Sequence, residues 1–582
     1  MPYGNTEQLS NLGNRLIELR RFNRIGDRYI LYAYILYIAS STKQEVSFAD
    51  LFSGKLIKDP LILSAIKEEI TKEIWENLKP LKKEFDSQCF ATFALSYSKN
   101  QIQSHVLNGF QFDPETPLSI IKLSEAILNI KNNEKVADIC CGSGGFLVDA
   151  CMKNKNATYF GYEINTKAAI NAYIRSVLLE DNISIELCNV FDIVNKESKY
   201  FTKGQKFDKI FANYPFGLRL KDIGSGSTYL SEIEKRCPTI SKSTSSDWAF
   251  NLLISDLLSE QGRGIGIMTN GSTWNTMDTP VREYFVKNGL IEAIIALPGK
   301  LFVDTPIPTS LIVLGHNKNQ TIRMIDATEL CEQGRRENIL TENNIAEILQ
   351  LYTKDAKKSK LVDVKTIEKN DYVLNPSRYL DTGIELKNAV KFGTVIKNIT
   401  RGANFTANQL DDMASNTRTD FQYLQLANIR HGQIDDDLPY LKSIDEKYLK
   451  YCLKNRCLII SKNSIPYKVA IAEIKDNKTV LASGNLYIIE LDEKKANPYY
   501  IKAFLDSQIG YALLKSITVG AVIPNIGIEA LKNMPIQLPD MEEQNKIAEE
   551  YLSVTDEIKI LKLRMEKALN KLNLVYDKAC GG

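Results

Sequence analysis

The spacing of apolar residues changes twice along the chain. Up to about residue 105, apolar and charged residues recur at helical spacing, as in KEEITKEIWENLKPLKKEF (67–85), with few turn residues. From residue 135, short apolar runs that end in Gly or Asp alternate with helical stretches, which is typical of a parallel β-sheet with helices on both faces. Beyond about residue 391, short β-like runs are separated by Asn, Asp, Gly and Pro. The pattern predicts a helical N-terminal domain, an α/β core and an α+β domain.

Seven apolar runs are expected to form strands of the core sheet, because each is short and is closed by a turn residue. In chain order they are KVADICCG (135–142), ATYFGYEIN (157–165), ISIELCNVFDI (183–193), FDKIFANYPFG (207–217), GRGIGIMTNG (262–271), IEAIIALPG (291–299) and TSLIVLG (309–315).

The C-terminal segment has a heptad repeat. Apolar residues recur there in alternating steps of four and three, which predicts a helix that pairs with another helix. The alternative is an amphipathic helix that lies on its own domain. The repeat consists of Ile547, Tyr551, Val554, Ile558, Leu561, Met565, Ala568, Leu572 and Val575.

Composition and charge narrow the class of protein. A chain of 582 residues has room for about four domains. With 73 basic against 71 acidic residues, a net charge of +2 argues against a protein that coats any polyanion. Ten cysteines without a C-x-x-C pair fit a reduced, cytoplasmic compartment, and three histidines leave few ligands for a metal site, so none is expected. The longest apolar run, 29–39, is too short to span a membrane, and no signal-peptide pattern opens the chain.

A glycine-rich turn follows the first expected strand. Glycines between a strand and a helix let a ligand approach the backbone, and the N–H groups that open the helix bind polar or anionic groups. A tight turn in any doubly wound sheet is the alternative interpretation. The candidate cofactor residues in this turn are Asp138, Cys140, Gly142, Ser143, Gly144, Gly145 and Phe146.

Acidic and amide side chains end the next two expected strands. Glu163 lies about twenty residues past the glycines, where an acidic residue can accept hydrogen bonds from both ribose hydroxyls of a nucleoside cofactor. Asn189 or Asp192 could receive an adenine amino group, and the sequence does not decide between them. A dinucleotide and S-adenosylmethionine both remain open, although the G-S-G-G-F spacing without a nearby phosphate-pairing Lys or Arg favours a cofactor that lacks a pyrophosphate.

The fourth expected strand ends in the motif Asn213-Tyr214-Pro215-Phe216. Methyl transfer to an exocyclic amine needs acceptors that hold the NH₂ group and turn its lone pair toward the methyl group. The Asn213 side-chain carbonyl and the Tyr214 backbone carbonyl are two such acceptors, and Phe216 offers a ring on which a flipped base can stack. The alternative is a polar turn that closes a strand.

These motifs resemble those of the N6-adenine DNA methyltransferases of type I restriction-modification systems. The likeness spans roughly residues 10 to 380 and includes Ala296 to Phe302, Ile307 to Leu314 and Asp371 to Tyr379. It implies a Rossmann-like core that uses S-adenosylmethionine, with Thr116 and Pro117 of the segment 113–117 at the methionine end of the cofactor. It implies an adenine-specific enzyme that acts on double-stranded DNA.

One position departs from the family pattern. The usual tetrapeptide is N-P-P-F or N-P-P-Y, and Tyr214 replaces its first proline. Any residue supplies the backbone carbonyl, so we expect an active enzyme, but the rigidity that proline gives to the loop is lost. Cytosine N4, RNA and protein glutamine are alternative methyl acceptors, and a DNA-binding scaffold with weak catalysis is the non-enzymatic alternative.

The C-terminal third resembles one target-recognition domain of a type I specificity subunit. The likeness rests on 392–402, 423–434, 520–528, 534–539 and 542–547. Between Lys442 and Lys468, seven basic residues stand against two acidic ones, which indicates a surface for phosphates or, alternatively, a solvated face. We expect a homodimer through the C-terminal helix, so that two chains read a two-part DNA site.

The resemblances and the apolar pattern together predict four domains. These are a helical N-terminal domain (1–110), an S-adenosylmethionine-dependent methyltransferase domain (111–384), a target-recognition domain (385–545) and a coiled-coil dimerisation helix (546–582). The sequence contains no G-x-x-x-x-G-K-[ST] motif and no convincing nuclease cluster in residues 1–110, so DNA cleavage is expected to need a separate restriction subunit.

Overall fold

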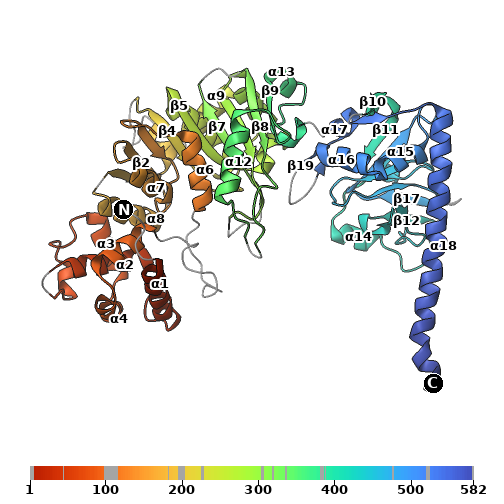
Figure 1. The fold of residues 1–582 in the computed structure, drawn as a ribbon. Coiled ribbons are helices and arrows are strands. Elements are labelled where there is room, and N and C mark those ends of the chain that lie inside the picture. Colours follow the sequence, from red (N-terminus) through yellow and green to blue (C-terminus); the bar gives the residue numbers. More distant parts are fainter. Residues whose placement is uncertain are drawn as a thin grey trace. The chain divides into compact units, whose positions relative to one another are not determined.

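The chain divides into two compact units, Met1–Leu380 and Asp381–Gly582. Figure 1 shows the elements of both units. The computed structural model describes residues 6–42, 45–96, 116–180, 182–194, 204–223, 228–302, 307–316, 320–334, 337–380, 386, 388–474, 478–519 and 525–579.

Helices make up the beginning of the first unit. They are α1 (Thr6–Arg21), α2 (Tyr29–Ser41), α3 (Pro60–Glu69), α4 (Lys72–Leu78) and α5 (Ser87–Ser96). The longest apolar run of the sequence forms α2, which is buried on almost every side. These helices share a hydrophobic core with Ile170 and Ile174 of α8 (Thr166–Leu178), so they pack directly against the sheet-containing part of the unit. Within the described residues, no helix combines the length and the apolar character needed to cross a membrane.

A nine-stranded sheet forms the centre of the first unit, with the order β3-β2-β1-β4-β5-β7-β6-β8-β9 (Figure 1). All seven expected strands are confirmed, and β8 and β9 were not expected. The strands are β1 (Lys135–Asp138), β2 (Thr158–Glu163), β3 (Ile183–Leu187), β4 (Phe207–Ala212), β5 (Leu258–Thr269), β6 (Ile291–Ala296), β7 (Thr309–Gly315), β8 (Thr321–Asp326) and β9 (Ser359–Asp363).

The sheet is mixed, whereas the sequence pattern predicted a parallel one. β1 to β5 pair in parallel, but β7 runs antiparallel to both of its neighbours, β5 and β6, and β9 runs antiparallel to β8. The short segment between β6 and β7 contains no described helix, and a parallel pair needs a longer crossover connection. The α/β class is confirmed, with a large sheet that is mainly parallel.

Hydrophobic cores cover both faces of this sheet, and the alternation along β4 shows the division. Ile210 belongs to one core and its neighbour Phe211 to the other, since successive side chains of a strand point to opposite faces. The first core includes residues of α9 (Thr228–Arg236), α10 (Asp247–Leu257), α11 (Thr279–Lys287) and α13 (Val364–Glu368). The second includes residues of α6 (Leu118–Leu128), α7 (Gly145–Lys153), α8 and α12 (Glu342–Thr353).

The second unit is built around a four-stranded sheet with the order β11-β18-β15-β16. Its strands are β11 (Ile396–Arg401), β18 (Leu486–Leu491), β15 (Leu458–Ser461) and β16 (Val469–Ile471). Helices α15 (Pro498–Asp506), α16 (Gln508–Ile517) and α17 (Ile528–Asn533) contribute to the same core. Its other elements are β10 (Ala389–Lys391), α14 (Ala407–Met413), β12 (Phe421–Leu424), β13 (Ile429–Arg430), β14 (Gln433–Ile434), β17 (Thr479–Ala482), β19 (Thr518–Val519), β20 (Asn525–Ile526) and β21 (Pro535–Gln537).

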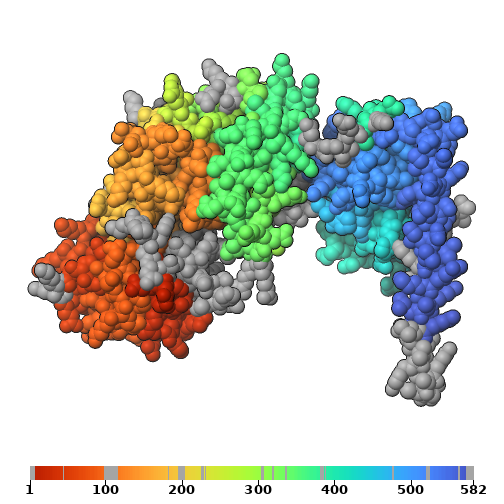
Figure 2. Space-filling view, in the orientation of Figure 1, coloured from red at the N-terminus to blue at the C-terminus, as the bar shows by residue number. Residues whose placement is uncertain are grey.

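A single helix of 39 residues, α18 (Met541–Ala579), ends the described chain. Its first turns are fixed to the second unit: the Asn497 N–H donates to Gln544 Oε1 at 2.9 Å, and the Tyr551 hydroxyl donates to Asp506 Oδ2 at 2.5 Å. The helix then runs on past the rest of its unit, and in the space-filling view it stands out from the unit's surface (Figures 1 and 2). There the heptad residues Val554, Ile558, Leu561 and Met565 are about half-exposed. The side chains of Leu572 and Val575 lie outside the described residues.

Candidate active site

The expected site residues gather at one edge of the large sheet. β1 to β4 are adjacent and parallel, so their carboxyl ends and the loops that follow them meet at that edge. Main-chain hydrogen bonds join these loops: the Cys141 N–H donates to Tyr162 O at 3.0 Å, and the Cys188 N–H donates to Glu163 O at 2.9 Å. The Ile139 N–H, directly after β1, donates to Phe211 O of β4 at 3.2 Å. The four sequence motifs therefore lie side by side at this edge.

The glycine-rich turn leaves open space on one side. Gly142 and Gly144 have φ angles of 53° and 85°, in the left-handed region that favours glycine. A Cβ on Gly142 would have no atom within 4 Å, whereas one on Gly144 would lie 3.3 Å from Ala172 Cβ. Gly145 begins α7. The turn thus packs against α8 at Gly144 and is open at Gly142, where a ligand can approach the backbone.

Two residues of the turn that were expected to bind the cofactor also have partners within the protein. Phe146 is buried and stacks on Phe211, with ring centroids 4.4 Å apart, so it supports the turn from within the core. Ser143 accepts hydrogen bonds from Arg175 Nη1 at its carbonyl (2.8 Å) and its hydroxyl (3.1 Å). The Arg175 Nε–H also donates to Ala94 O of α5, at 2.9 Å. This buried arginine, which no sequence motif indicated, links the turn to the N-terminal helices.

Glu163 is held in place by the backbone. Its Oε2 accepts from the Gly142 N–H at 2.8 Å and its Oε1 accepts from the Asn165 N–H at 2.7 Å. The residue is partly exposed, so each oxygen can accept a further hydrogen bond. The carboxylate that was expected to bind the ribose thus also fixes the glycine-rich turn.

Asp138 and Cys140 lie directly before the glycines. Asp138 is buried and its Oδ1 accepts from the Cys140 N–H at 3.1 Å, while Cys140 itself is partly exposed. Burial, together with the nearby negative charge of Glu163, raises the pKa of Asp138 to about 8. A cation bound beside such a carboxyl group favours its ionised form.

The loop after β3 distinguishes Asn189 from Asp192. Asn189 Oδ1 accepts from the Phe191 N–H at 3.1 Å, so it caps the short turn that follows. Asp192 is partly exposed, and within the described part of the chain its carboxylate accepts no hydrogen bond. The two candidates thus differ in that Asn189 Oδ1 already accepts a hydrogen bond, whereas the Asp192 carboxylate accepts none from a described residue.

Among the described residues, the Asn213 side-chain amide has a hydrogen-bond partner at its nitrogen but none at its oxygen. Its Nδ2 donates to Thr116 Oγ1 at 2.9 Å, and its Oδ1 is buried with no hydrogen-bond partner among the described residues. Pro117 is the N-cap of α6, so Thr116 directly precedes a fixed helix end. Residues 113–115 of the same expected segment lie outside the described residues. A buried acceptor without a donor is costly, and such an atom at a site edge fits a ligand N–H.

The other three residues of the motif differ in exposure. Tyr214 is buried: its hydroxyl donates to Asn251 Oδ1 at 3.2 Å, and its ring stacks on Phe250 with centroids 4.9 Å apart. Pro215 is exposed, and Phe216 is partly exposed with its ring edge-to-face against Phe302 at 5.4 Å. Asn251 was missed in the sequence, although a lone asparagine in the apolar stretch WAFNLLI (248–254) was the available signal.

The basic stretch of the second unit is less basic than its sequence suggests. Lys447 pairs with Asp445, Lys454 with Glu490 and Arg456 with Glu493. The partners Glu490 and Glu493 come from outside the stretch, so its local charge is partly neutralised. Among the described residues, no group of three His, Cys, Asp or Glu side chains is arranged to hold a metal ion.

Comparisons with known proteins match both units. Residues 109–387 match the N-6 DNA methylase family, and residues 419–571 match the type I restriction modification DNA specificity domain. The methylase subunit of type I restriction enzyme MjaVIII from Methanocaldococcus jannaschii is 29% identical over 306 residues, which cover 49% of this chain and 52% of that protein. The MpnII methylase subunit from Mycoplasma pneumoniae is 23% identical over 367 residues, covering 59% and 67%. The chain thus spans about half of the length of the first relative.

A solved structure is also similar. The methyltransferase subunit of the type I restriction-modification system from Streptococcus thermophilus has 23% identity and a TM-score of 0.44, and the match covers 57% of this chain and 71% of that one.

Proposed function

Because the chain joins an N-6 DNA methylase domain to a type I restriction modification DNA specificity domain, we propose that it is a sequence-specific DNA methyltransferase. It transfers a methyl group from S-adenosylmethionine to the N6 amino group of an adenine flipped out of duplex DNA. The observation that carries this proposal is the state of the Asn213 side chain. Its buried Oδ1 has no hydrogen-bond donor among the described residues, while its Nδ2 already donates to Thr116.

The residues around the glycine-rich turn fit S-adenosylmethionine. Gly142 leaves room for the cofactor beside the backbone, and the Glu163 oxygens can accept from the ribose hydroxyls. Asp192 would accept from the adenine amino group, and Asp138 lies where a cationic sulfonium or ammonium group is favoured. Thr116 and Pro117 would meet the methionine end. When bound, the cofactor supplies an electrophilic methyl group on a sulfonium sulfur.

Two acceptors of the Asn213-Tyr214 segment would orient the target amine. Asn213 Oδ1 accepts one N6 hydrogen, and the Tyr214 main-chain carbonyl, which accepts no hydrogen bond from a described residue, accepts the other. Holding both hydrogens turns the nitrogen lone pair out of the ring plane and toward the methyl group. The new N–C bond then forms as the S–C bond breaks, and the extra N6 proton leaves to solvent.

Phe216 would hold the flipped base. The residue is partly exposed, and the edge-to-face contact with Phe302 restrains the orientation of its ring. Stacking on a fixed ring repays part of the cost of removing the base from the helix. Because stacking does not select one base, the choice of adenine rests on the acceptors and on the sequence context.

The second unit would select the DNA sequence, since a pocket that holds one base reads little of its surroundings. The half-exposed heptad residues of α18 are the surface by which two chains would form a homodimer that reads a two-part site. A separate restriction subunit would supply cleavage in a restriction-modification system.

The test is modified-base sequencing of DNA from an expression strain that carries the wild-type chain or the Asn213→Ala variant. The expected result is N6-methyladenine at one recurrent sequence with the wild type, and none above background with the variant. N4-methylcytosine instead would show that the acceptor base is wrong. No DNA methylation by a folded protein that binds both the cofactor and DNA would favour the scaffold. Tritium transfer to RNA or to a protein glutamine, without transfer to DNA, would show that the class of substrate is wrong.

A further inference from the structure

Tyr214 replaces a proline of the usual motif, and its side chain points into the core rather than toward the site. We propose that this side chain is a positioning residue: by anchoring in a pocket formed by α10 and β5, it holds Asn213 and the Tyr214 carbonyl in place, as a proline ring would otherwise do. The expected effect on catalysis rests on the proposed methyl transfer. The packing of the Tyr214 side chain does not depend on it.

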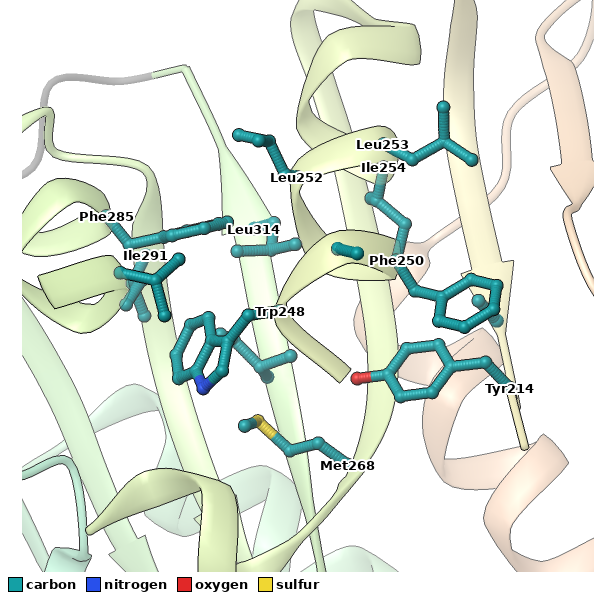
Figure 3. Close-up of a cluster of buried hydrophobic side chains, with 14 of the residues drawn as sticks. Tyr214, Trp248, Phe250, Leu252, Leu253, Ile254, Met268, Phe285, Ile291 and Leu314 are labelled. Carbon is teal, nitrogen blue, oxygen red and sulfur yellow. The ribbon is translucent and has the colours of Figure 1, made fainter. Parts of the chain in front are cut away.

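The pocket fits the tyrosine closely. Tyr214 is 1% exposed, and its ring lies nearly parallel to that of Phe250, with an interplanar angle of 9° and centroids 4.9 Å apart. Figure 3 shows the two rings side by side, with Met268 below them. The Tyr214 hydroxyl donates to Asn251 Oδ1 at 3.2 Å. Phe250 and Asn251 are consecutive residues of α10, so the ring face and the hydroxyl are both held by one rigid helix.

Gly266 of β5 closes the pocket on the other side. A Cβ at this position would lie 2.3 Å from Asn251 Oδ1 and 3.2 Å from Tyr214 Cε1. No side chain larger than that of glycine fits while the tyrosine and asparagine keep their positions. Asn251 is fully buried, and its Nδ2 is 3.9 Å from Met268 Sδ, so the amide oxygen is directed toward the tyrosine hydroxyl.

These contacts resist movement of the loop. If the loop shifted, the aromatic ring would leave its stacked position, and Asn251 Oδ1 would lose its donor inside the core, which costs more than a hydrogen bond lost to water. The anchored residue lies between Asn213 and Pro215, so its main chain is fixed within one residue of the proposed acceptors. Proline restrains a loop by fixing its own φ, whereas Tyr214 restrains it through the packing of its side chain against α10 and β5.

β5 offers a matched pair of substitutions for the test. Gly266→Ala crowds Asn251 and Tyr214, whereas Gly264→Ala, two residues earlier, also crowds α10 but at Ile254 Cγ2, which a Cβ would approach to 2.3 Å. Both variants are expected to be less stable. Only Gly266→Ala is expected to speed amide hydrogen exchange in residues 211–219 and to lower kcat by about 100-fold, with unchanged affinity for S-adenosylmethionine.

Substitutions of Tyr214 itself complete the experiment. Tyr214→Phe keeps the ring and loses the hydroxyl, so its kcat is expected to fall by only about tenfold. Tyr214→Ala removes the anchor without supplying a proline, so its kcat is expected to fall further than that of Tyr214→Phe. Equal exchange rates and equal kcat in the two glycine variants, or full activity of Tyr214→Ala, would overturn the proposal. A wild-type protein that shows the slow exchange but no methyl transfer would reject the proposed function and leave the anchor standing.

Discussion

Asn213 and Thr116, 97 residues apart in the sequence, are joined by a hydrogen bond of 2.9 Å from Asn213 Nδ2 to Thr116 Oγ1. This bond directs the amide nitrogen toward α6 and leaves the amide oxygen as the free, buried acceptor. Thr116 therefore sets which end of the Asn213 side chain would face the proposed substrate.

The first prediction concerns this bond. Thr116→Val keeps the shape of the side chain but removes the acceptor, so the Asn213 amide can rotate. We expect kcat for DNA methylation to fall by about tenfold, because the contact between Asn213 Oδ1 and the target amine in the transition state is weakened. Steady-state tritium transfer to cognate DNA measures it. Thr116→Ser retains the hydroxyl and is expected to stay close to wild type; a Thr116→Val enzyme with wild-type kcat would show that the bond has no role in orientation.

Asp138 should make cofactor affinity depend on pH. The pKa of about 8 in the free protein leaves the carboxyl largely neutral near pH 7, and a bound cation favours its ionised form. The affinity for S-adenosylmethionine is therefore expected to rise more steeply with pH in the wild type than in Asp138→Asn, as calorimetry at several pH values would show. Titration of the cofactor itself affects both proteins equally, so it cancels in the comparison. Equal slopes of affinity against pH in the two proteins would contradict the prediction.

The same group sets a pH dependence of stability. A carboxyl whose pKa is higher in the folded state than in the unfolded chain stabilises the fold below the unfolded pKa, and this contribution is lost as the pH rises through the folded pKa of about 8. The cofactor-free wild type should thus lose thermal stability between about pH 5 and about pH 9. Asp138→Asn should lose less over that range, which differential scanning calorimetry can measure.

Arg175 should contribute to cofactor binding without contacting the cofactor. Arg175→Met leaves the carbonyls of Ala94 and Ser143 without this donor inside the protein, so a loss of about 3 kcal/mol in the free energy of unfolding is expected. The loosened turn should also bind S-adenosylmethionine about tenfold more weakly.

Arg282 provides the matched control for Arg175. It is also buried and donates to main-chain carbonyls, those of Tyr372, Ser272 and Asn275, but it does not touch the glycine-rich turn. Arg282→Met should destabilise the protein to a similar degree and leave cofactor affinity unchanged at temperatures where both variants are folded. If both variants bind the cofactor equally well, the link between Arg175 and the turn has no role in binding.

The exposed part of α18 should control association. Ile558→Glu with Leu561→Glu places charges at two heptad positions, and a paired seam would have to bury them. The variant is expected to be a monomer by light scattering, whereas the wild type is a dimer. Ile560→Glu is the control, because Ile560 is exposed to a similar degree as Ile558, 51% against 47%, but lies outside the heptad positions. A monomeric wild type, free and bound to DNA, would remove the dimer.

The apolar runs identified seven of the nine strands of the large sheet, including the edge strand β3, whose side chains alternate between buried and exposed. β7, with seven buried residues, was expected, whereas β8 (TIRMID) and the edge strand β9 (SKLVD) alternate with polar residues and were missed. An edge strand needs less apolar surface, so its sequence resembles a loop.

The sequence indicated candidate site residues where polar side chains directly follow a strand. Glu163, Asn189 and Asn213 each come at or just after a strand end, and the parallel pairing of the strands brings them together. Arg175 and Asn251, which bond to the neighbouring residues Ser143 and Tyr214, lie within helices. Their roles depend on which strand or loop each helix packs against, and no local pattern contains that information.

The hydrogen bond from the Gly142 N–H to Glu163 has a consequence for the energetics of ligand capture. The protein's own hydrogen bond restrains the turn, because the Glu163 carboxylate holds the Gly142 N–H. Less conformational entropy is then lost when the proposed cofactor binds, so a larger share of its contact energy appears as affinity. Association is expected to occur in one fast step, without a slow rearrangement of the protein before or after the encounter.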